Sequence, residues 1–273
     1  VAITSPDGGA APEISDVYPG YNTLTTAAVG VKAYSDREDT IEALPETLAG
    51  ATLIQTSRGD RGDGQLINVF RFTDHPATQF PDQVTLTWSE DPKTTMTVQW
   101  RTSTDVRRGV VRYATRRSHN SFAPTAPATA VATTELLETP ETVNDPLCNR
   151  HTVVLRGLAP GTTYVYSVGD GTEVATTELA EFTTAPDGVE PFSFVYMGDA
   201  QNGLDRWGSL VNNAFRERPD AAFYVMAGDL VNRGNDRDDW DSFFHNAEGI
   251  YDRRVLVPAI GNHEDQGGRP RLY

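Results

Sequence analysis

The chain has 273 residues, a length that favours about two domains. Its 38 acidic and 23 basic residues give a formal net charge of −15, which disfavours nonspecific binding to nucleic acid or to an anionic membrane. Cys148 is the single cysteine, so an intrachain disulfide and a cysteine-based zinc site are both excluded. No apolar run approaches the roughly 18 residues of a membrane span. The start at Val1, without a signal peptide, suggests a processed or cut chain and leaves export open.

Residues 1–80 are expected to form a linker and a small β-rich module. Val1–Gly20 is rich in Pro, Gly, Ala, Ser and acidic residues, a composition typical of a linker. Strands are predicted at Leu24–Tyr34, Ala51–Thr56 and Leu66–Phe72. The doubled Arg-Gly-Asp at Arg58–Asp63 has the residues of a solvated hairpin loop, which we favour over an adhesion motif.

An antiparallel sandwich is predicted over residues 81–187, with one buried face per sheet. Apolar residues alternate with polar ones at Val84, Leu86 and Trp88, then Met96, Val98 and Trp100, then Val111 and Tyr113, then Val153 and Leu155, then Tyr164, Tyr166 and Val168. Turn residues such as Asp91-Pro92 and Ala159-Pro-Gly161 interrupt this alternation. Ser118–Asn149, rich in Thr, Ala and Pro, is expected to be a long irregular excursion.

Residues 188–273 contain three apolar runs that each end in a polar signature. They lie in Phe192–Gln201, Ala221–Asn232 and Arg254–Glu264. Between them, two segments have helical periodicity, at Trp207, Leu210, Val211 and Ala214, and at Trp240, Phe243, Phe244, Ala247 and Tyr251. The order strand, helix, strand, helix, strand predicts a parallel sheet with covered faces.

The polar residues after these strands are expected to converge on one rim, because the carboxyl ends of parallel strands open toward one edge. The candidates are Asp199, Gln201, Asp229, Asn232, Asn262 and His263. Hard oxygen ligands and an imidazole suit one or two divalent cations. No Ser or Cys stands at an equivalent strand end, so a covalent nucleophile has no obvious candidate. Taken singly, each Gly-Asp is also typical of an ordinary turn.

Three motifs in order carry a resemblance to a known family. Gly198-Asp-Ala-Gln, Gly228-Asp-Leu-Val-Asn and Gly261-Asn-His-Glu resemble the motifs of calcineurin-like metallophosphoesterases. Leu158–Val168 resembles the closing hairpin of a fibronectin type III domain; with Gln83–Thr102 it is similar to the N-terminal domain of purple acid phosphatases. The implied fold is multidomain: an all-β fibronectin-like sandwich over 81–187, then the N-terminal half of an α/β metallophosphoesterase domain over 188–273, incomplete at its C-terminus.

The resemblance implies roles for individual residues. Asp199 would bind one metal ion, Asp229 would bridge two, and Asn262 would bind the other. Gln201 stands where many members have His, and its amide oxygen favours manganese, iron or magnesium over zinc, although zinc is possible. Asn232 stands where purple acid phosphatases have Tyr, so no coloured iron–tyrosinate centre is expected. His263 would stabilise the transferring phosphoryl group or protonate the leaving oxygen.

The activity that the resemblance implies is hydrolysis of phosphate esters, with monoesters favoured, by two divalent metal ions in a secreted, periplasmic or cell-surface protein. The alternative is a secreted or cell-surface binding protein whose phosphatase-like domain is degenerate. Members of the family complete the site with later histidines, but no His follows His263 here. We therefore expect this chain on its own to bind metal loosely, to be inactive and to be prone to aggregation.

Overall fold

The computed structural model describes residues 76–120, 126–138, 147–172 and 175–265, together with the backbone of four strands near the N-terminus. The chain divides into two compact units, one over Val1–Asp74 and the other over His75–Thr142 and Pro146–Tyr273, with Val143–Asp145 grouped with the first. In the part of the chain that the structure describes, no helix is long and apolar enough to cross a membrane.

The N-terminal unit contains a four-stranded sheet in the order β1-β2-β4-β3, formed by β1 (Ala2–Thr4), β2 (Gly30–Tyr34), β3 (Ala51–Arg58) and β4 (Leu66–Phe72). These four strands lie within the range for which a small β-rich module was predicted. Ala2–Thr4, within the segment predicted to be a linker, pair in parallel with β2. Arg58 ends β3, and the rest of the doubled Arg-Gly-Asp lies outside the described residues.

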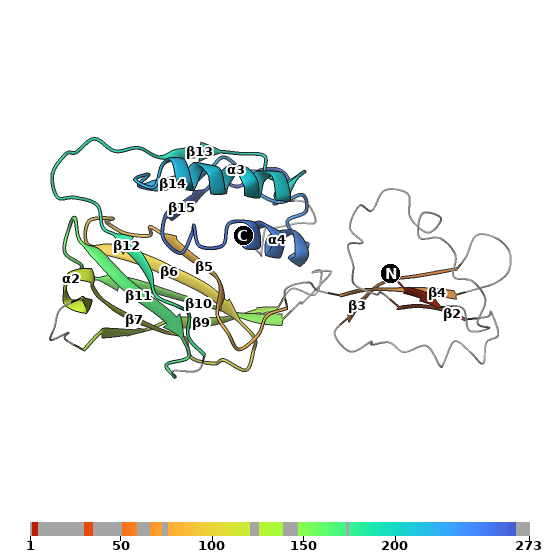
Figure 1. Ribbon diagram of the computed structural model, residues 1–273. Coiled ribbons are helices and arrows are strands. Elements are labelled where there is room, and N and C mark those ends of the chain that lie inside the picture. The colour runs from red at the N-terminus through yellow and green to blue at the C-terminus, as the bar shows by residue number, and fades with distance from the viewer. Residues whose placement is uncertain are drawn as a thin grey trace. The chain divides into compact units, whose positions relative to one another are not determined.

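The sandwich of the second unit consists of two four-stranded antiparallel sheets (Figure 1). One has the order β5-β6-β10-β9, from β5 (Asp82–Thr87), β6 (Thr95–Thr102), β10 (Leu147–Arg156) and β9 (Thr133–Glu138). The other has the order β12-β11-β7-β8, from β12 (Ala180–Thr183), β11 (Thr163–Gly169), β7 (Val110–Thr115) and β8 (Ala128–Val131). A short helix, α2 (Arg116–His119), follows β7. This arrangement is that of immunoglobulin-like and fibronectin-like sandwiches, as predicted.

The sandwich core contains the alternating residues that the sequence indicated. Leu86, Val98, Trp100, Tyr166 and Val168 are almost completely buried in it. The prediction that one face of each sheet is solvated is wrong for β6, whose outward-facing Thr97 and Arg101 are also buried. The cause is that the following domain covers the outer face of this sheet, as the contact of α4 with β5 shows.

The prediction of an irregular excursion over Ser118–Asn149 is also wrong. This segment contains β8, β9 and the first residues of β10. The exposure patterns of β8 and β9 show mostly exposed side chains. These are edge strands whose Thr-rich sequence favours extended backbone without the apolar alternation that marks a half-buried strand.

The rest of the second unit is a parallel sheet in the order β13-β14-β15 (Figure 1), from β13 (Val195–Met197), β14 (Phe223–Met226) and β15 (Val255–Pro258). The connections contain α3 (Leu204–Glu217) and α4 (Arg237–Asn246). Because strand order follows chain order, right-handed crossovers place both helices on one face of the sheet. Ala247 and Tyr251, predicted in the second helix, lie beyond its end because the chain turns through Gly249 at φ +76°.

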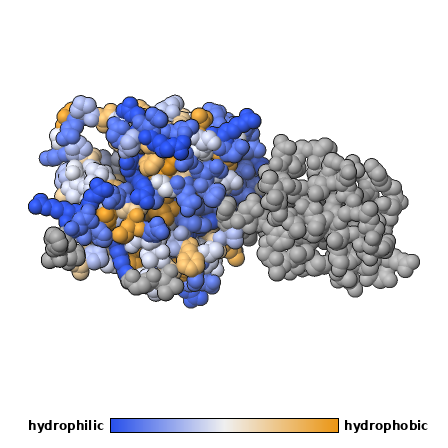
Figure 2. Space-filling model, in the orientation of Figure 1, coloured by the Kyte–Doolittle hydropathy of each residue, from blue (hydrophilic) through white to orange (hydrophobic). Residues whose placement is uncertain are grey.

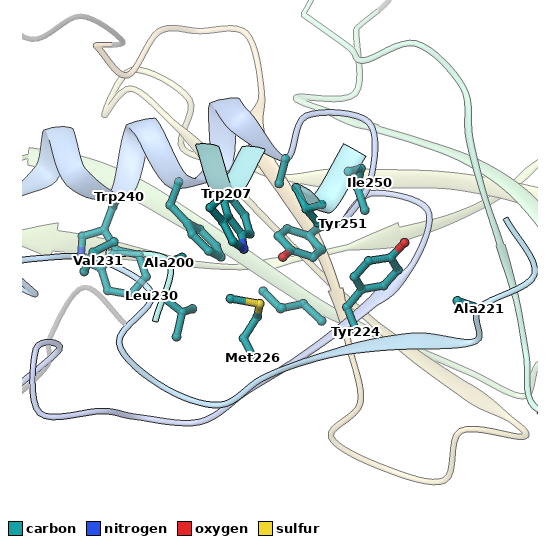
Figure 3. Packing of buried hydrophobic residues seen from close by; sticks show 14 residues of the cluster. Ala200, Trp207, Ala221, Tyr224, Met226, Leu230, Val231, Trp240, Ile250 and Tyr251 are labelled. Atoms are coloured by element: carbon teal, nitrogen blue, oxygen red, sulfur yellow. The ribbon is translucent and has the colours of Figure 1, made fainter. Parts of the chain in front are cut away.

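One core joins this sheet to its helices (Figure 3). The side chains of Tyr224 and Met226 of β14 point toward the side on which Trp207 of α3 and Tyr251 lie (Figure 3). Trp207 stacks on Phe243 of α4 with ring centroids 4.6 Å apart. The rings of Tyr224 and Tyr251 meet edge to face. Aromatic pairs of this kind add to the stability gained from burial, so they stabilise the sheet from which the motif loops extend.

The opposite face of the sheet contacts the sandwich. Trp88 meets Phe223 of β14 edge to face, at 5.4 Å between ring centroids. The hydroxyl of Tyr166 donates to the carbonyl of Asp252 at 2.6 Å.

The face shown in Figure 2 is mainly hydrophilic, with hydrophobic residues gathered in a few patches.

Candidate metal centre

The motif residues follow the carboxyl ends of the three parallel strands. Asp199 comes two residues after β13 and Asp229 comes three residues after β14. Both aspartates have left-handed backbone conformations, with φ of 52° and 53°. Such conformations are uncommon for residues other than glycine and occur where the surrounding structure imposes them, often at functional sites. In the described parts, three non-glycine residues have positive φ, and two of them are these motif aspartates.

Backbone hydrogen bonds join the first motif loop to the second. The amide of Asp199 donates to the carbonyl of Gly228 at 3.2 Å, and the amide of Gln201 donates to the carbonyl of Asp229 at 3.2 Å. These bonds place the two loops side by side.

The second loop is joined to the third through the Asp229 carboxylate. Its Oδ1 accepts a hydrogen bond from the amide of His263 at 3.0 Å. A Cβ atom on Gly261 would lie 2.1 Å from the same oxygen, so only glycine permits this approach. One oxygen of the expected bridging ligand thus has a fixed position relative to the Gly-Asn-His motif.

Glu264 is a site residue that the sequence analysis did not assign. Its side chain is buried, at 1% exposure, and its carboxylate accepts four backbone hydrogen bonds. The donors are the amides of Asp229, Leu230, Val231 and Gly261, at 2.9, 2.7, 3.2 and 2.7 Å. Glu264 therefore holds the second loop to the third. The available signal was an acidic residue directly after Gly-Asn-His, but three of its four partners lie more than 30 residues earlier in the chain.

The imidazole of His263 has a defined tautomer. Its Nδ1 lies 2.8 Å from the carbonyl oxygen of Asn232, which can only accept, so the proton is on Nδ1. The carbonyl of His263 accepts from the amide of Gly234 at 3.0 Å. Asn232 thus contributes its backbone carbonyl to the site. This is the position at which the sequence comparison above places the tyrosine of purple acid phosphatases.

The remaining candidates differ in exposure. Asp199 and Asn262 are exposed, whereas Gln201 is partly buried. The Gln201 amide oxygen, Oε1, is buried and accepts no hydrogen bond from the residues that the structure describes. A buried acceptor without a donor is costly, and coordination of a cation would satisfy it.

The donor chemistry fits a divalent cation. Two carboxylates and two amide oxygens are the hard ligands that magnesium and manganese prefer. Among the described residues, no group of three or more His, Cys, Asp or Glu has a metal-binding arrangement. The four candidate ligands would therefore leave coordination positions to water or to further residues.

Two hollows, of about 100 and 580 Å³, lie between the sandwich and α4. Neither hollow is lined by Asp199, Gln201, Asp229, Asn262 or His263. The prediction that these five residues share one cleft stays a prediction; what the structure brings together is their loops.

Comparisons with known proteins agree with this architecture. Residues 81–184 match the family of the purple acid phosphatase N-terminal domain, and residues 192–273 match the calcineurin-like phosphoesterases. The predicted relationship is thereby confirmed, because both parts occur in the expected order.

Two kinds of relatives support the assignment. An uncharacterized protein of Mycobacterium tuberculosis, found in two strains, is 34% identical over an alignment of 132 residues that covers 42% of this chain and 24% of that protein. This chain thus spans about a quarter of the length of the curated relatives it matches. The solved purple acid phosphatase from yellow lupin seeds matches with a TM-score of 0.56 and 19% identity, over 72% of this chain and 38% of that chain. This second likeness shows the fold.

Proposed function

We propose that the protein hydrolyses phosphate esters, with monoesters favoured over diesters, at a centre of two divalent metal ions. The observation that carries this proposal is the junction of three motif loops. The Asp229 carboxylate accepts from the His263 amide, and the buried oxygen of Gln201 has no donor in the described part of the chain. The calcineurin-like family match supports the reaction class. The preference for monoesters rests on the order of the two domains.

The ligands in this proposal are Asp199, Gln201, Asp229 and Asn262. The metal ions would supply a bound hydroxide nucleophile and neutralise the phosphoryl oxygens. The neutral amides of Gln201 and Asn262 add oxygen ligands without negative charge that would repel a phosphate. For a chain with a net charge of −15, this limit on local charge matters.

His263 acts on the leaving group in this proposal. Because Nδ1 donates to Asn232, the ring is oriented and Nε2 is the nitrogen that would hold a proton near the ester oxygen. Glu264 does not act on substrate; it keeps Asp229 and Gly261 in place through its amide contacts.

The test is turnover by the natural full-length protein. Purified protein is stripped of metal, loaded with manganese, magnesium, ferrous iron or zinc, and assayed with p-nitrophenyl phosphate and bis-p-nitrophenyl phosphate. We expect metal-dependent hydrolysis that is faster with the monoester, and no turnover by the 273-residue chain alone. Failure of every loaded form to hydrolyse either ester would favour the alternative of a binding protein with a degenerate site.

We also propose that the protein acts outside the cytoplasm, in line with its similarity to purple acid phosphatases. Immunoblots of cytoplasmic, envelope and culture fractions test this location; signal confined to the cytoplasmic fraction would contradict it.

A further inference from the structure

The outward face of the sandwich carries a row of four charges on neighbouring strands. In the register of the sheet, Asp82 pairs with Arg101, Arg101 with Arg150, and Arg150 with Glu135. Two like charges side by side are unfavourable in a sheet. Negative charge from outside the sheet offsets the repulsion between Arg101 and Arg150. Asp241 of helix α4 supplies such a charge.

Arg101 joins the sandwich to α4 through a buried ion pair. Its Nε and Nη2 donate to the two oxygens of Asp82 at 2.9 and 2.6 Å. Its Nη1 donates to Oδ1 of Asp241 in α4 at 2.7 Å, and both of these side chains are almost completely buried. Burial disfavours the charge of Arg101, but hydrogen bonding to Asp82 and the charges of Asp82 and Asp241 outweigh it and raise the pKa of Arg101.

Gln83 makes a second contact with the same carboxylate. Its Nε2 donates to Oδ1 of Asp241 at 2.7 Å. The backbone of Gln83 has φ +50° and lies where the register of β5 and β6 is interrupted, between Asp82 and Thr85. A strained residue in a strand persists only where its surroundings fix it. The irregularity in β5 is thus located at the contact with α4.

Helix α4 is in turn tied to the loops of the candidate metal centre. Trp240, next to Asp241, donates its indole N–H to the carbonyl of Gly234 at 2.9 Å. The amide of Gly234 donates to the carbonyl of His263 at 3.0 Å. A Cβ atom on Gly234 would lie 2.0 Å from the carbonyl oxygen of Glu264, so this glycine is in direct contact with the third motif loop.

We propose that the sandwich positions His263 through α4: Arg101 and Gln83 hold Asp241, and Trp240 holds the contact between Gly234 and His263. Arg101, Gln83, Asp241 and Trp240 are positioning residues, because none of them is placed at the reacting atoms. This inference rests on the proposed function and gives the sandwich a part in the reaction, in place of an independent binding role.

The test compares Asp241→Asn with Arg156→Gln in the natural full-length protein. Arg156 is a matched control, since it is an exposed arginine of the same sandwich and, among the described residues, pairs only with Glu90. The substrates are p-nitrophenyl phosphate, whose leaving group needs little protonation, and glycerol phosphate, whose alkoxide needs it. Hydrogen exchange at the Gly234 amide provides a readout that does not depend on activity.

We expect Asp241→Asn to lower kcat for glycerol phosphate on the order of 100-fold, the effect of misplacing a catalytic group by about 1 Å. The loss for p-nitrophenyl phosphate should be smaller, KM should change little, and exchange at Gly234 should accelerate. Arg156→Gln should alter none of these quantities.

Gln83→Ala serves if Asp241→Asn fails to fold. It removes one donor to Asp241 and leaves Arg101 paired, so a smaller loss in the same direction is expected. A variant that melts earlier but keeps the parental ratio of the two kcat values and the parental exchange at Gly234 would overturn the inference. If the parent hydrolyses neither ester, the proposed function fails, and exchange at Gly234 alone then decides the positioning role.

Discussion

Replacing Glu264 by glutamine tests whether its carboxylate holds two motif loops together. Oε1 accepts from the amides of Leu230 and Val231, and Oε2 from those of Asp229 and Gly261. Glutamine keeps one oxygen and puts an NH₂ group, which cannot accept, in place of the other. Two of the four bonds are lost whichever way the amide turns. At roughly 1.5–3 kcal/mol for a hydrogen bond to a charged group, the loss is roughly 3–6 kcal/mol.

An opposing effect reduces this figure. The carboxylate is buried, so glutamine avoids part of the cost of removing a charge from water. We therefore expect the free energy of unfolding to fall by about 3 kcal/mol, at the lower end of that range.

Urea unfolding, followed by circular dichroism, measures this change. Glu248→Gln is the control, because that carboxylate is 82% exposed and should shift the free energy of unfolding by less than about 0.5 kcal/mol. Isothermal titration with Mn²⁺ should show an affinity about 10–100-fold weaker for Glu264→Gln, as for other residues that support metal ligands. Parental stability together with parental hydrogen exchange at Leu230 and Val231 would refute the reasoning.

Three further substitutions test other parts of the molecule. Asp229→Asn in the full-length protein should abolish phosphate release while the circular dichroism spectrum is unchanged, because an amide cannot replace the charge of a bridging carboxylate; near-parental turnover with bound metal would make Asp229 a turn residue only. Burial lowers the pKa of His151 from 6.5 to about 4. The free energy of unfolding should therefore fall by about 3 kcal/mol as the pH falls from 6.5 through 4. The difference in this free energy between the parent and His151→Gln, measured at pH 7 and at pH 4, should show this loss. Gly234→Ala would put Cβ 2.0 Å from a carbonyl oxygen and should lower the free energy of unfolding by roughly 1–3 kcal/mol. Gly188→Ala, with no atom within 4 Å of the new Cβ, should lower it little. Equal melting temperatures of the two variants would contradict the contact at Gly234.

The strand-end motifs could be predicted from the sequence because their information is local. An apolar run followed by Gly-Asp predicts a strand and a polar loop, and right-handed crossovers then place Asp199 and Asp229 at one edge. The role of Glu264 could not be predicted in this way, since it depends on amides of residues 229–231 that only the folded sheet brings near. The edge strands β8 and β9 were missed for a related reason: their side chains are mostly exposed, so burial imposes no period on their sequence.

Strand β6 shows why a period-two pattern describes only one of two buried surfaces. Met96, Val98 and Trp100 face the sandwich core, and their alternation marks the strand in the sequence. On the other face, Arg101 is 2% exposed although it is charged, because Asp82 and Asp241 satisfy it. A polar residue in such a pattern is read as solvated, since hydropathy records the side chain and not its partner. A buried interface made of ion pairs therefore has no hydropathy signal, and the coupling between the sandwich and α4 becomes visible only when the hydrogen-bond partners of each charged side chain are known.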